Sequence, residues 1–357
     1  MEDAEHKVIG LMSGTSLDGL DIASCVFSQR SGKWEYRIVN AQTIPYDEPM
    51  RSWLRSLETS DAAAFAQAHA DFGFYLGKQT AAFMKAQSLV PDLIASHGHT
   101  IFHQPAKHFT AQIGSGNVIA AQTGIAVAFD FRSLDVALGG QGAPLVPVGD
   151  ELLFSEYDFC LNLGGFANIS YRHNNRRIAF DICPVNIVMN AIAARSGKNY
   201  DDEGKMAAGG MLSHYLLNEL NQLGFYKMTA DAPKSLGKEW VIGNVDPILD
   251  NYDLSDDDLL NTLCEHIAFQ VGKVLKGKPK GKLLVTGGGA YNAYLLERMR
   301  KHIDHEIIIP DTLTIEYKEA LIFAFLGLLR MKNEVNCFSS VTGASRDSCC
   351  GVLVQPK

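Results

Sequence analysis

The chain has 357 residues, which is enough for two domains of ordinary size, each with its own hydrophobic core. Apolar residues make up 46% and charged residues 20%, the balance of a soluble globular protein. The net charge is −8, with both signs spread along the chain, and this excludes a general nucleic-acid binder because that class needs a basic face.

Neither a membrane segment nor a secretion signal is visible. The longest apolar run, residues 320–329, is too short to cross a bilayer and fits a buried helix better. The seven cysteines are an odd number without CxxC spacing, which indicates reduced thiols. We therefore expect a cytoplasmic protein that does not bind membranes.

The first half of the chain alternates strand-like and helix-like segments. A period near two predicts strands, and apolar residues at helical spacing predict helices. The predicted strands are 7–12, 20–27, 34–43, 92–96, 109–113 and 125–131, and the predicted helices lie within 62–89 and 117–123. This alternation predicts an α/β fold. Residues 138–148, LGGQGAPLVPV, are either a linker or a shaped loop.

The second half opens with the same layout as the first. A predicted strand, a Gly164–Gly165 turn and two further strands repeat the opening order of strand, small-residue loop, strand and strand. This indicates a weak structural copy of the first half. The predicted strands are 157–163, 166–171, 177–182 and 282–286, and the predicted helices are 185–195, 211–223, 255–275, 291–301 and 319–331.

The opening loop, MSGTSLDGLD at residues 12–21, is a candidate phosphate loop. It lacks the lysine and the following helix of the Walker type. Gly14 and Gly19 would allow the backbone to turn sharply and approach a ligand. Thr15 and Ser16 add hydroxyl groups suited to phosphate. Asp18 and Asp21 add carboxylates suited to the water shell of a metal ion. Taken alone, such a stretch is more often only a turn.

Two further glycine loops strengthen the nucleotide interpretation. Residues 162–165 lie between two predicted strands, and residues 286–290 lie between a strand and a helix. A strand that runs into glycine-rich backbone and a helix N-terminus is a natural nucleotide site. Three such loops, two of them in matching places, predict one nucleotide held across a cleft.

Three side chains are candidates for chemistry, and each has a plainer alternative. Asp181 ends a predicted strand and would serve as a general base or cap the next helix. Arg132 would clamp an anionic group of a substrate or form a surface salt bridge. Glu319 opens the last predicted helix, and its plainer role there would be to interact favourably with the positive end of the helix dipole.

The histidines of SHGHTIFH invite a zinc interpretation. The spacing of His97, His99 and His103 fits no usual zinc pattern, and no cysteine accompanies them. We therefore interpret them as substrate-cleft or core histidines and predict no protein-held metal site.

Together these motifs resemble one family, anhydro-N-acetylmuramic acid kinase of the actin-like ATPase and sugar kinase superfamily. The resemblance covers nearly the whole chain, and MSGTSLDG and GGQGAPLVP are its most specific motifs. The segments that carry it are GLMSGTSLDGLD (10–21), SHGHTIFHQP (96–105), QIGSGNVIA (112–120), DFRSLDVALGGQGAPLVP (130–147), LNLGGFANI (161–169), DDEGKMAAGG (201–210), PKSLGKEW (233–240), TGGGAYN (286–292) and EALIFAFLG (319–327).

The resemblance implies an α/β fold of duplicated actin-like ATPase (ribonuclease H-like) domains, with the active site in the interdomain cleft. The first domain would span residues 1–140 and the second 141–330, with the tail 331–357 returning to the first. A homodimer is also implied.

The implied reaction uses ATP, Mg²⁺ and water. It opens 1,6-anhydro-N-acetylmuramic acid and phosphorylates O6, which gives N-acetylmuramic acid 6-phosphate and ADP in peptidoglycan recycling. The alternative is an ATP-binding regulator, or a weakened paralogue that acts on another sugar. The partner would be a small anhydro-amino-sugar, with no nucleic acid and no membrane.

The resemblance also implies residue roles. Asp181 matches the catalytic base, and His97, Arg132 and Glu319 match positions that bind the sugar. The residues matching the nucleotide-binding segments are Gly14, Thr15, Ser16, Leu17, Asp18, Gly19, Leu20, Asp21, Gly164, Gly165, Asn168, Gly287, Gly288 and Gly289.

The chain departs from the family at two motifs. The usual DTGPGN is DICPVN here, so Ile182, Cys183 and Val185 replace a threonine and two glycines. Larger side chains at these positions would close off backbone approach or forbid a positive φ, and so displace the loop of the base. The usual HGQT is HGHT, which places His99 where a glutamine is expected and alters one polar contact.

Overall fold

The computed structural model describes residues 5–228 and 234–356, which form two compact units. The first unit comprises residues up to Ser155 together with those from Tyr317 onwards, and the second runs from Glu156 to Glu316. Three stretches lie outside the described residues: 1–4, 229–233 and 357. They fall at the predicted start of the first domain, at the start of the PKSLGKEW segment and just before it, and at the end of the predicted tail. The predicted domain limits at 140/141 and 330/331 stay a prediction.

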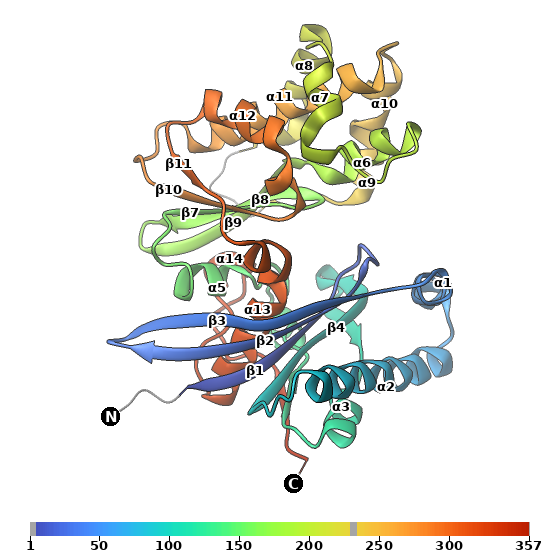
Figure 1. The fold of residues 1–357 in the computed structure, drawn as a ribbon, viewed down its shortest axis with the longest axis vertical. Helices are drawn as coiled ribbons and strands as arrows, with labels where there is room; N and C mark the ends of the chain where they lie inside the picture. Colours follow the sequence, from blue (N-terminus) through green and yellow to red (C-terminus); the bar gives the residue numbers. More distant parts are fainter. Residues whose placement is uncertain (1–4, 229–233, 357) are drawn as a thin grey trace. The chain divides into compact units, whose positions relative to one another are not determined.

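The first unit is built on a seven-stranded sheet, coloured from blue to green in Figure 1 except for its last strand. Its strands are β1 (His6–Ser13), β2 (Gly19–Arg30), β3 (Lys33–Pro45), β4 (Leu93–Gln104), β5 (Phe109–Ile113), β6 (Val127–Phe129) and β12 (Val352–Val354). The order is β12-β6-β4-β1-β2-β3, and β5 pairs with β4. β1, β2 and β3 are antiparallel, whereas β4 runs parallel to both β1 and β6.

The second unit has a five-stranded sheet with the same arrangement. Its strands are β7 (Phe159–Leu163), β8 (Phe166–His173), β9 (Arg176–Pro184), β10 (Lys282–Thr286) and β11 (Glu306–Ile308), in the order β11-β10-β7-β8-β9. β7, β8 and β9 are antiparallel, and β10 is parallel to β7 and β11. In both sheets, three antiparallel strands that are consecutive in the chain are followed across the sheet by two parallel strands. This shared order confirms the predicted duplicated α/β fold.

Helices connect the strands within both units. The first unit contains α1 (Glu48–Ser56), η1 (Leu57–Thr59), α2 (Ala62–Ala86), η2 (Pro105–Lys107), α3 (Gly116–Thr123), α4 (Ser133–Ala137), α5 (Pro147–Leu152) and α14 (Ser339–Thr342). The second contains α6 (Asn186–Arg195), η3 (Asp202–Gly204), α7 (Lys205–Gly209), α8 (His214–Asn221), η4 (Gly224–Lys227), α9 (Lys238–Asn244), α10 (Asp246–Asp250), α11 (Asp256–Leu275), η5 (Gly288–Tyr291) and α12 (Ala293–His302). The long helix α13 (Thr312–Met331) crosses the division between the units.

The two faces of β1 pack against different helices because side chains alternate along a strand. Ile9 and Leu11 belong to a buried cluster with Phe72 and Leu76 of α2. On the opposite face, a Cβ added to Gly10 would overlap the carbonyl oxygen of Ala320 in α13. The glycine therefore allows α13 to approach the sheet closely.

Several predicted bounds are wrong for identifiable reasons. The sequence predicts that β4 ends at residue 96, but it continues to Gln104, because the polar residues Ser96, His97 and His99 are buried within the sheet. α13 begins at Thr312 rather than at Glu319, so Glu319 lies inside the helix. The segment 138–148 is a shaped loop within the first unit that leads into α5. No helix among the described residues is long and apolar enough to span a membrane.

Candidate active site

The opening loop connects β1 to β2 through residues 14–18. Leu17 adopts a positive φ of 62°, and its N–H donates to the Gly14 carbonyl at 3.2 Å. Thr15 and Ser16 are exposed, and within the described residues their N–H groups have no acceptor. A Cβ on Gly14 would meet only Ser16, at 3.4 Å from Oγ. The loop therefore presents backbone and hydroxyl donors to solvent, as an anion site requires.

The base of this loop is fixed by Ser13. Its hydroxyl accepts from Tyr46 Oη at 2.7 Å and lies 2.9 Å from His99 Nδ1. The tautomer of His99 sets which of the two atoms donates, and in either case the ring ties the Ser13 hydroxyl to β4. Burial lowers the pKa of His99 to about 4, so the ring is neutral at pH 7. His99, the residue at which HGHT departs from the family pattern, therefore contacts the residue that fixes the base of the opening loop.

The remaining residues predicted for the first phosphate segment differ in their surroundings. Asp18 is exposed, whereas Leu20 is fully buried and its side chain belongs to the core. Asp21 lies on β2 opposite Met12 and Thr43, and its Oδ1 accepts from Thr43 Oγ1 at 2.6 Å. Thr43 is a neighbour that the sequence did not reveal, since 22 residues separate it from Asp21.

His97, which is buried, and Arg132, which is half-buried, form a pair in the first unit. Arg132 donates from Nε at 3.1 Å and from Nη2 at 2.9 Å to His97 Nε2, and from Nη1 to the Gly142 carbonyl at 2.6 Å. Burial lowers the pKa of Arg132 to about 10, which leaves it charged at neutral pH. Burial and the charge of Arg132 lower the pKa of His97 well below its usual value. The structure thus brings together two of the three residues predicted to bind the sugar.

Glu319, the third of these, acts on Arg132 through its charge. It counters the lowering of the Arg132 pKa. Glu319 keeps some exposed surface. Desolvation by the surrounding protein atoms nevertheless raises the pKa of its carboxyl group. Since α13 begins seven residues earlier, the explanation of Glu319 as a helix-dipole residue is wrong.

His97 also lines a pocket of about 470 Å³. Its polar lining comes from β4, β5 and the start of α4 with the segment before it, and includes Gln112, Asp130 and Ser133. Neither Arg132 nor Glu319 lines it, so this pocket is distinct from the place where those two side chains interact.

In the second unit, a row of polar residues crosses four neighbouring strands. Thr286 pairs with Asn162, Asn162 with Asn168, and Asn168 with Asp181. Residues paired directly across strands share a face of the sheet, so the four side chains lie side by side on it. The row places Asn168 and Asp181, predicted separately, next to each other. Asn162 and Thr286 are further members that only the register reveals.

Asp181 lies inside β9, three residues before its end, so its prediction as a strand-end residue is wrong. The helix-cap alternative is also wrong, since Val185 is the N-cap of α6 and no side chain of the described residues caps that helix. The Oδ2 atom of Asp181 instead accepts from the Leu236 N–H at 2.8 Å. Burial raises the pKa of Asp181 to about 6, while the Leu236 N–H and the Lys234 charge act to lower it. Such a carboxylate suits general-base work near neutral pH.

The residues that depart from the family pattern lie in the core. The pairing of β8 with β9 shifts between Ala167 and Asn168, which leaves Ile182 as an extra residue after Asp181. Such a bulge turns the neighbouring side chains. Ile182, Cys183 and Val185 are at most 2% exposed, and none of them has a positive φ. The expected conflict with positive φ is therefore absent at these three residues.

The glycine loops of the second unit meet at the end of β7. A Cβ on Gly287, whose φ is 80°, would lie 2.5 Å from Asn162 Oδ1, and one on Gly289 would lie 2.7 Å from the Leu163 Cβ. Asn186 is not among the predicted site residues, and it donates from Nδ2 to the Leu163 carbonyl at 3.1 Å. The glycines thus allow the run after β10 to pack directly beside the loop after β7.

The Gly164–Gly165 turn keeps its N–H groups available. The two carbonyls accept from the N–H groups of Asn186 at 3.2 Å and Val185 at 2.8 Å. Within the described part of the chain, the N–H groups of Gly164 and Gly165 have no backbone acceptor. This turn therefore fits a phosphate group in the same way as the opening loop.

The described residues contain no cluster of three or more histidine, cysteine, aspartate or glutamate side chains suited to a metal ion. A nucleotide-bound Mg²⁺ keeps several waters and needs only one or two carboxylates. Asp18 and Asp21, in and beside the opening loop, fit that more modest requirement.

Each unit therefore opens with a β-hairpin whose loop offers unused N–H donors, on one shared order of strands. This duplicated ribonuclease H-like arrangement defines the class of actin-like ATPases and sugar kinases. Within that class, the family model described as anhydro-N-acetylmuramic acid kinase matches residues 6–356. The chain belongs to the anhydro-N-acetylmuramic acid kinase family.

Individual relatives agree with this assignment. The anhydro-N-acetylmuramic acid kinase of Vibrio vulnificus (strain YJ016) is 34% identical over 97% of each chain. That of Saccharophagus degradans is 35% identical over 98% of each chain. Among solved structures, the activator of the 2-hydroxyisocaproyl-CoA dehydratase from Clostridium difficile is similar at 14% identity and a TM-score of 0.42, over 91% of this chain and 96% of that one.

Proposed function

We propose that the protein is a kinase that uses ATP, Mg²⁺ and water to open 1,6-anhydro-N-acetylmuramic acid and to phosphorylate O6. The products are N-acetylmuramic acid 6-phosphate and ADP, as peptidoglycan recycling requires. The observation that carries the proposal is Asp181, a carboxylate whose pKa is raised to about 6 in a polar row beside two glycine loops. Membership of the kinase family supports it.

Asp181 is the proposed general base. It would take a proton from the water that attacks the anomeric carbon, while the bond from that carbon to O6 breaks. The released O6 accepts the terminal phosphoryl group of ATP, and ADP leaves. Phosphoryl transfer thus replaces the protonation of the leaving oxygen, so no second carboxylic acid is needed.

The N–H groups of the two hairpin loops are the proposed phosphate ligands. Thr15 and Ser16 in one unit, and Gly164 and Gly165 in the other, offer donors without partners in the described chain. Such fixed donors stabilise the charge of a transferring phosphoryl group. Mg²⁺ supplies further neutralisation when bound, and Asp18 or Asp21 would hold its water shell.

Arg132 is the proposed ligand of the lactyl carboxylate. Of its five N–H groups, those used by His97 and Gly142 leave one on each terminal nitrogen. Two such donors match a carboxylate bidentately. His97 holds the guanidinium in this orientation, and Glu319 is proposed to bind the sugar as well. These contacts would distinguish muramic acid from amino sugars that lack the lactyl group.

The test is formation of a phosphosugar by purified protein given ATP, Mg²⁺ and the anhydro-sugar, followed by mass spectrometry. A related enzyme under the same conditions is the control. Absence of product while the control succeeds would overturn the proposal. The alternative of a weakened paralogue is not favoured, because the substituted residues after Asp181 lie in the core.

We also propose a cytoplasmic homodimer. The resemblance to the family supports this assembly, and analytical ultracentrifugation tests it. A single species with the mass of one chain at micromolar concentration would contradict the dimer.

A further inference from the structure

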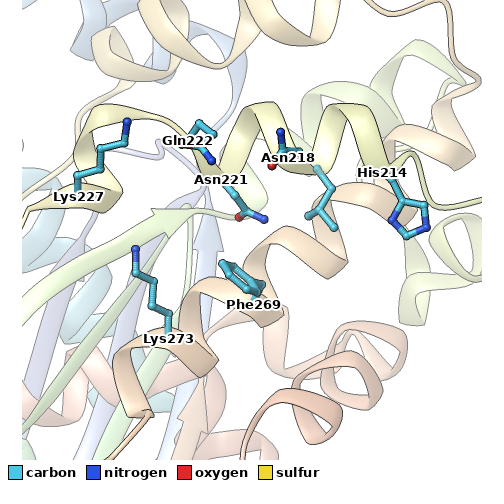
Figure 2. A pocket seen from close by; sticks show the side chains of 8 residues that line it. His214, Asn218, Asn221, Gln222, Lys227, Phe269 and Lys273 are labelled. Atoms are coloured by element: carbon cyan, nitrogen blue, oxygen red, sulfur yellow. The ribbon is translucent and has the colours of Figure 1, made fainter.

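The second unit contains a pocket that none of the proposed kinase residues lines. It measures about 530 Å³ and lies between α8, η4 and α11. Figure 2 shows Lys227 and Lys273 at one end, His214 at the other, and the amide side chains of α8 between them. The complete lining is His214, Leu217, Asn218, Asn221, Gln222, Lys227, Phe269 and Lys273.

The charge of this pocket is one-sided. Two lysines and a histidine line it, and no aspartate or glutamate of the described residues does. Neither Lys227 nor Lys273 makes an ion pair within the described parts of the chain. The whole chain carries a net charge of −8, so a basic pocket on it is a local feature rather than a reflection of composition. Such a pocket attracts anions.

Asn221 turns a hydrogen-bond donor into the pocket. Its Oδ1 accepts from His266 Nδ1 at 2.8 Å and from Gln270 Nε2 at 2.7 Å. Burial lowers the pKa of His266 to about 3, so the ring is neutral, and because Asn221 Oδ1 can only accept, the ring proton lies on Nδ1. With its oxygen fixed by two donors, Asn221 presents its NH₂ group to the pocket.

Lys273 is held in place as well. Its Nζ donates to the Tyr226 carbonyl at 2.7 Å, which uses one of its three N–H groups and leaves two. The position of Lys273 in the last turn of α11 would by itself satisfy the helix dipole. A helix dipole, however, does not account for the fixed orientation of Asn221.

The rest of the lining suits a sugar. Phe269 is 39% exposed and offers an aromatic face, on which the C–H groups of a sugar ring can pack. Asn218 and Gln222 provide donors and acceptors for hydroxyl groups. A volume of about 530 Å³ is also far larger than a lone phosphate requires.

We propose that this pocket binds a small phosphorylated sugar, with the phosphate at Lys227, Lys273 and Asn221 and the ring against Phe269. The inference stands independently of the kinase reaction.

Isothermal titration calorimetry of the full chain tests it, with glucose 6-phosphate, inorganic phosphate and glucose as probes. We expect glucose 6-phosphate to bind, glucose not to bind, and inorganic phosphate to bind at least tenfold more weakly. Lys227→Gln combined with Lys273→Gln should weaken glucose 6-phosphate at least tenfold. The matched control, Lys198→Gln with Lys301→Gln, removes the same charge from exposed positions outside the pocket and should leave binding unchanged.

Circular dichroism confirms that the pocket variant is folded, and Phe269→Ala provides a second variant that leaves all charges in place. Loss of affinity in that variant supports the ring contact. The proposal is overturned if glucose 6-phosphate does not bind at millimolar concentration, or if both lysine pairs have the same effect. Equal affinity for inorganic phosphate and glucose 6-phosphate would overturn the sugar part.

Discussion

Asp181 Oδ2 accepts a hydrogen bond from the main-chain N–H of Leu236 at 2.8 Å, and this bond orients a carboxylate whose pKa burial raises to about 6. Asp181→Asn preserves the acceptor oxygen and removes the base. We expect turnover to fall by at least about a thousandfold while nucleotide binding is kept. Product formation and calorimetry with ADP measure the two quantities. Retained turnover would contradict the role of Asp181.

The pH dependence of turnover should follow this carboxylate. The base works only when ionised, so kcat/KM should fall tenfold per pH unit below an apparent pKa near 6. The Lys234 charge lowers the Asp181 pKa, so Lys234→Met should move this acid limb to higher pH. Lys198→Met, which removes an exposed charge of the same unit, should leave the limb in place. A limb that stays fixed in Lys234→Met would refute the electrostatic argument.

The same shift predicts a stability effect of Asp181→Asn. The folded-state pKa of about 6 lies above the ordinary value of 3.8, so the buried charge destabilises the fold above pH 6 and ceases to do so as the pH falls through both values. At pH 7.5, we expect the free energy of unfolding of Asp181→Asn to exceed that of the natural chain by on the order of 2 kcal/mol. Denaturant unfolding at pH 7.5 and at pH 4 checks the sign, since the difference should shrink at the lower pH.

His99 is predicted to act on the opening loop through Ser13. His99→Ala removes the hydrogen-bond partner of the Ser13 hydroxyl and should raise KM for ATP about fivefold, the effect of one hydrogen bond of about 1 kcal/mol. His99→Gln restores a side chain that can donate or accept a hydrogen bond, and it is the residue usual in the family, so KM should stay within about twofold of the natural chain. Equal kinetics for both variants would show that the Ser13 contact does not matter.

Gly287 is required both by its φ and by its neighbours. Gly287→Ala places a Cβ 2.5 Å from Asn162 Oδ1 at a φ of 80°, so we expect a loss of at least about 3 kcal/mol in unfolding free energy. Gly32→Ala is the matched control, because Gly32 has the same φ of 80° and no atom within 4 Å of the added Cβ. It should cost only about 1 kcal/mol. Equal losses in thermal unfolding would mean that the contact with β7 is unimportant.

The DICPVN segment should contribute stability rather than limit the rate. Ile182→Thr, Cys183→Gly and Val185→Gly together empty core positions that are at most 2% exposed, so we expect at least about 3 kcal/mol of destabilisation. Turnover of the fraction that stays folded should not rise. A large increase in kcat would show that the native residues do hinder the base.

The sequence by itself determined most of the local structure. Period-two alternation located the central strands, and the glycine positions located the three loops, because both signals depend on near neighbours in the chain. The motif pattern by itself also indicates the family. The predicted bounds of an element are wrong where polar residues are buried, as in β4. They are also wrong where a helix begins before its apolar run, as in α13.

Only the tertiary structure decided which side chains meet. The row from Thr286 to Asp181 depends on the register of four strands, two of which lie more than 100 residues apart. A shift of one residue in that register would turn Asp181 to the opposite face, and nothing local to Asp181 specifies it. The contact of His99 with Ser13 and the pocket between α8 and α11 likewise join distant segments, because packing rather than local propensity brings them together.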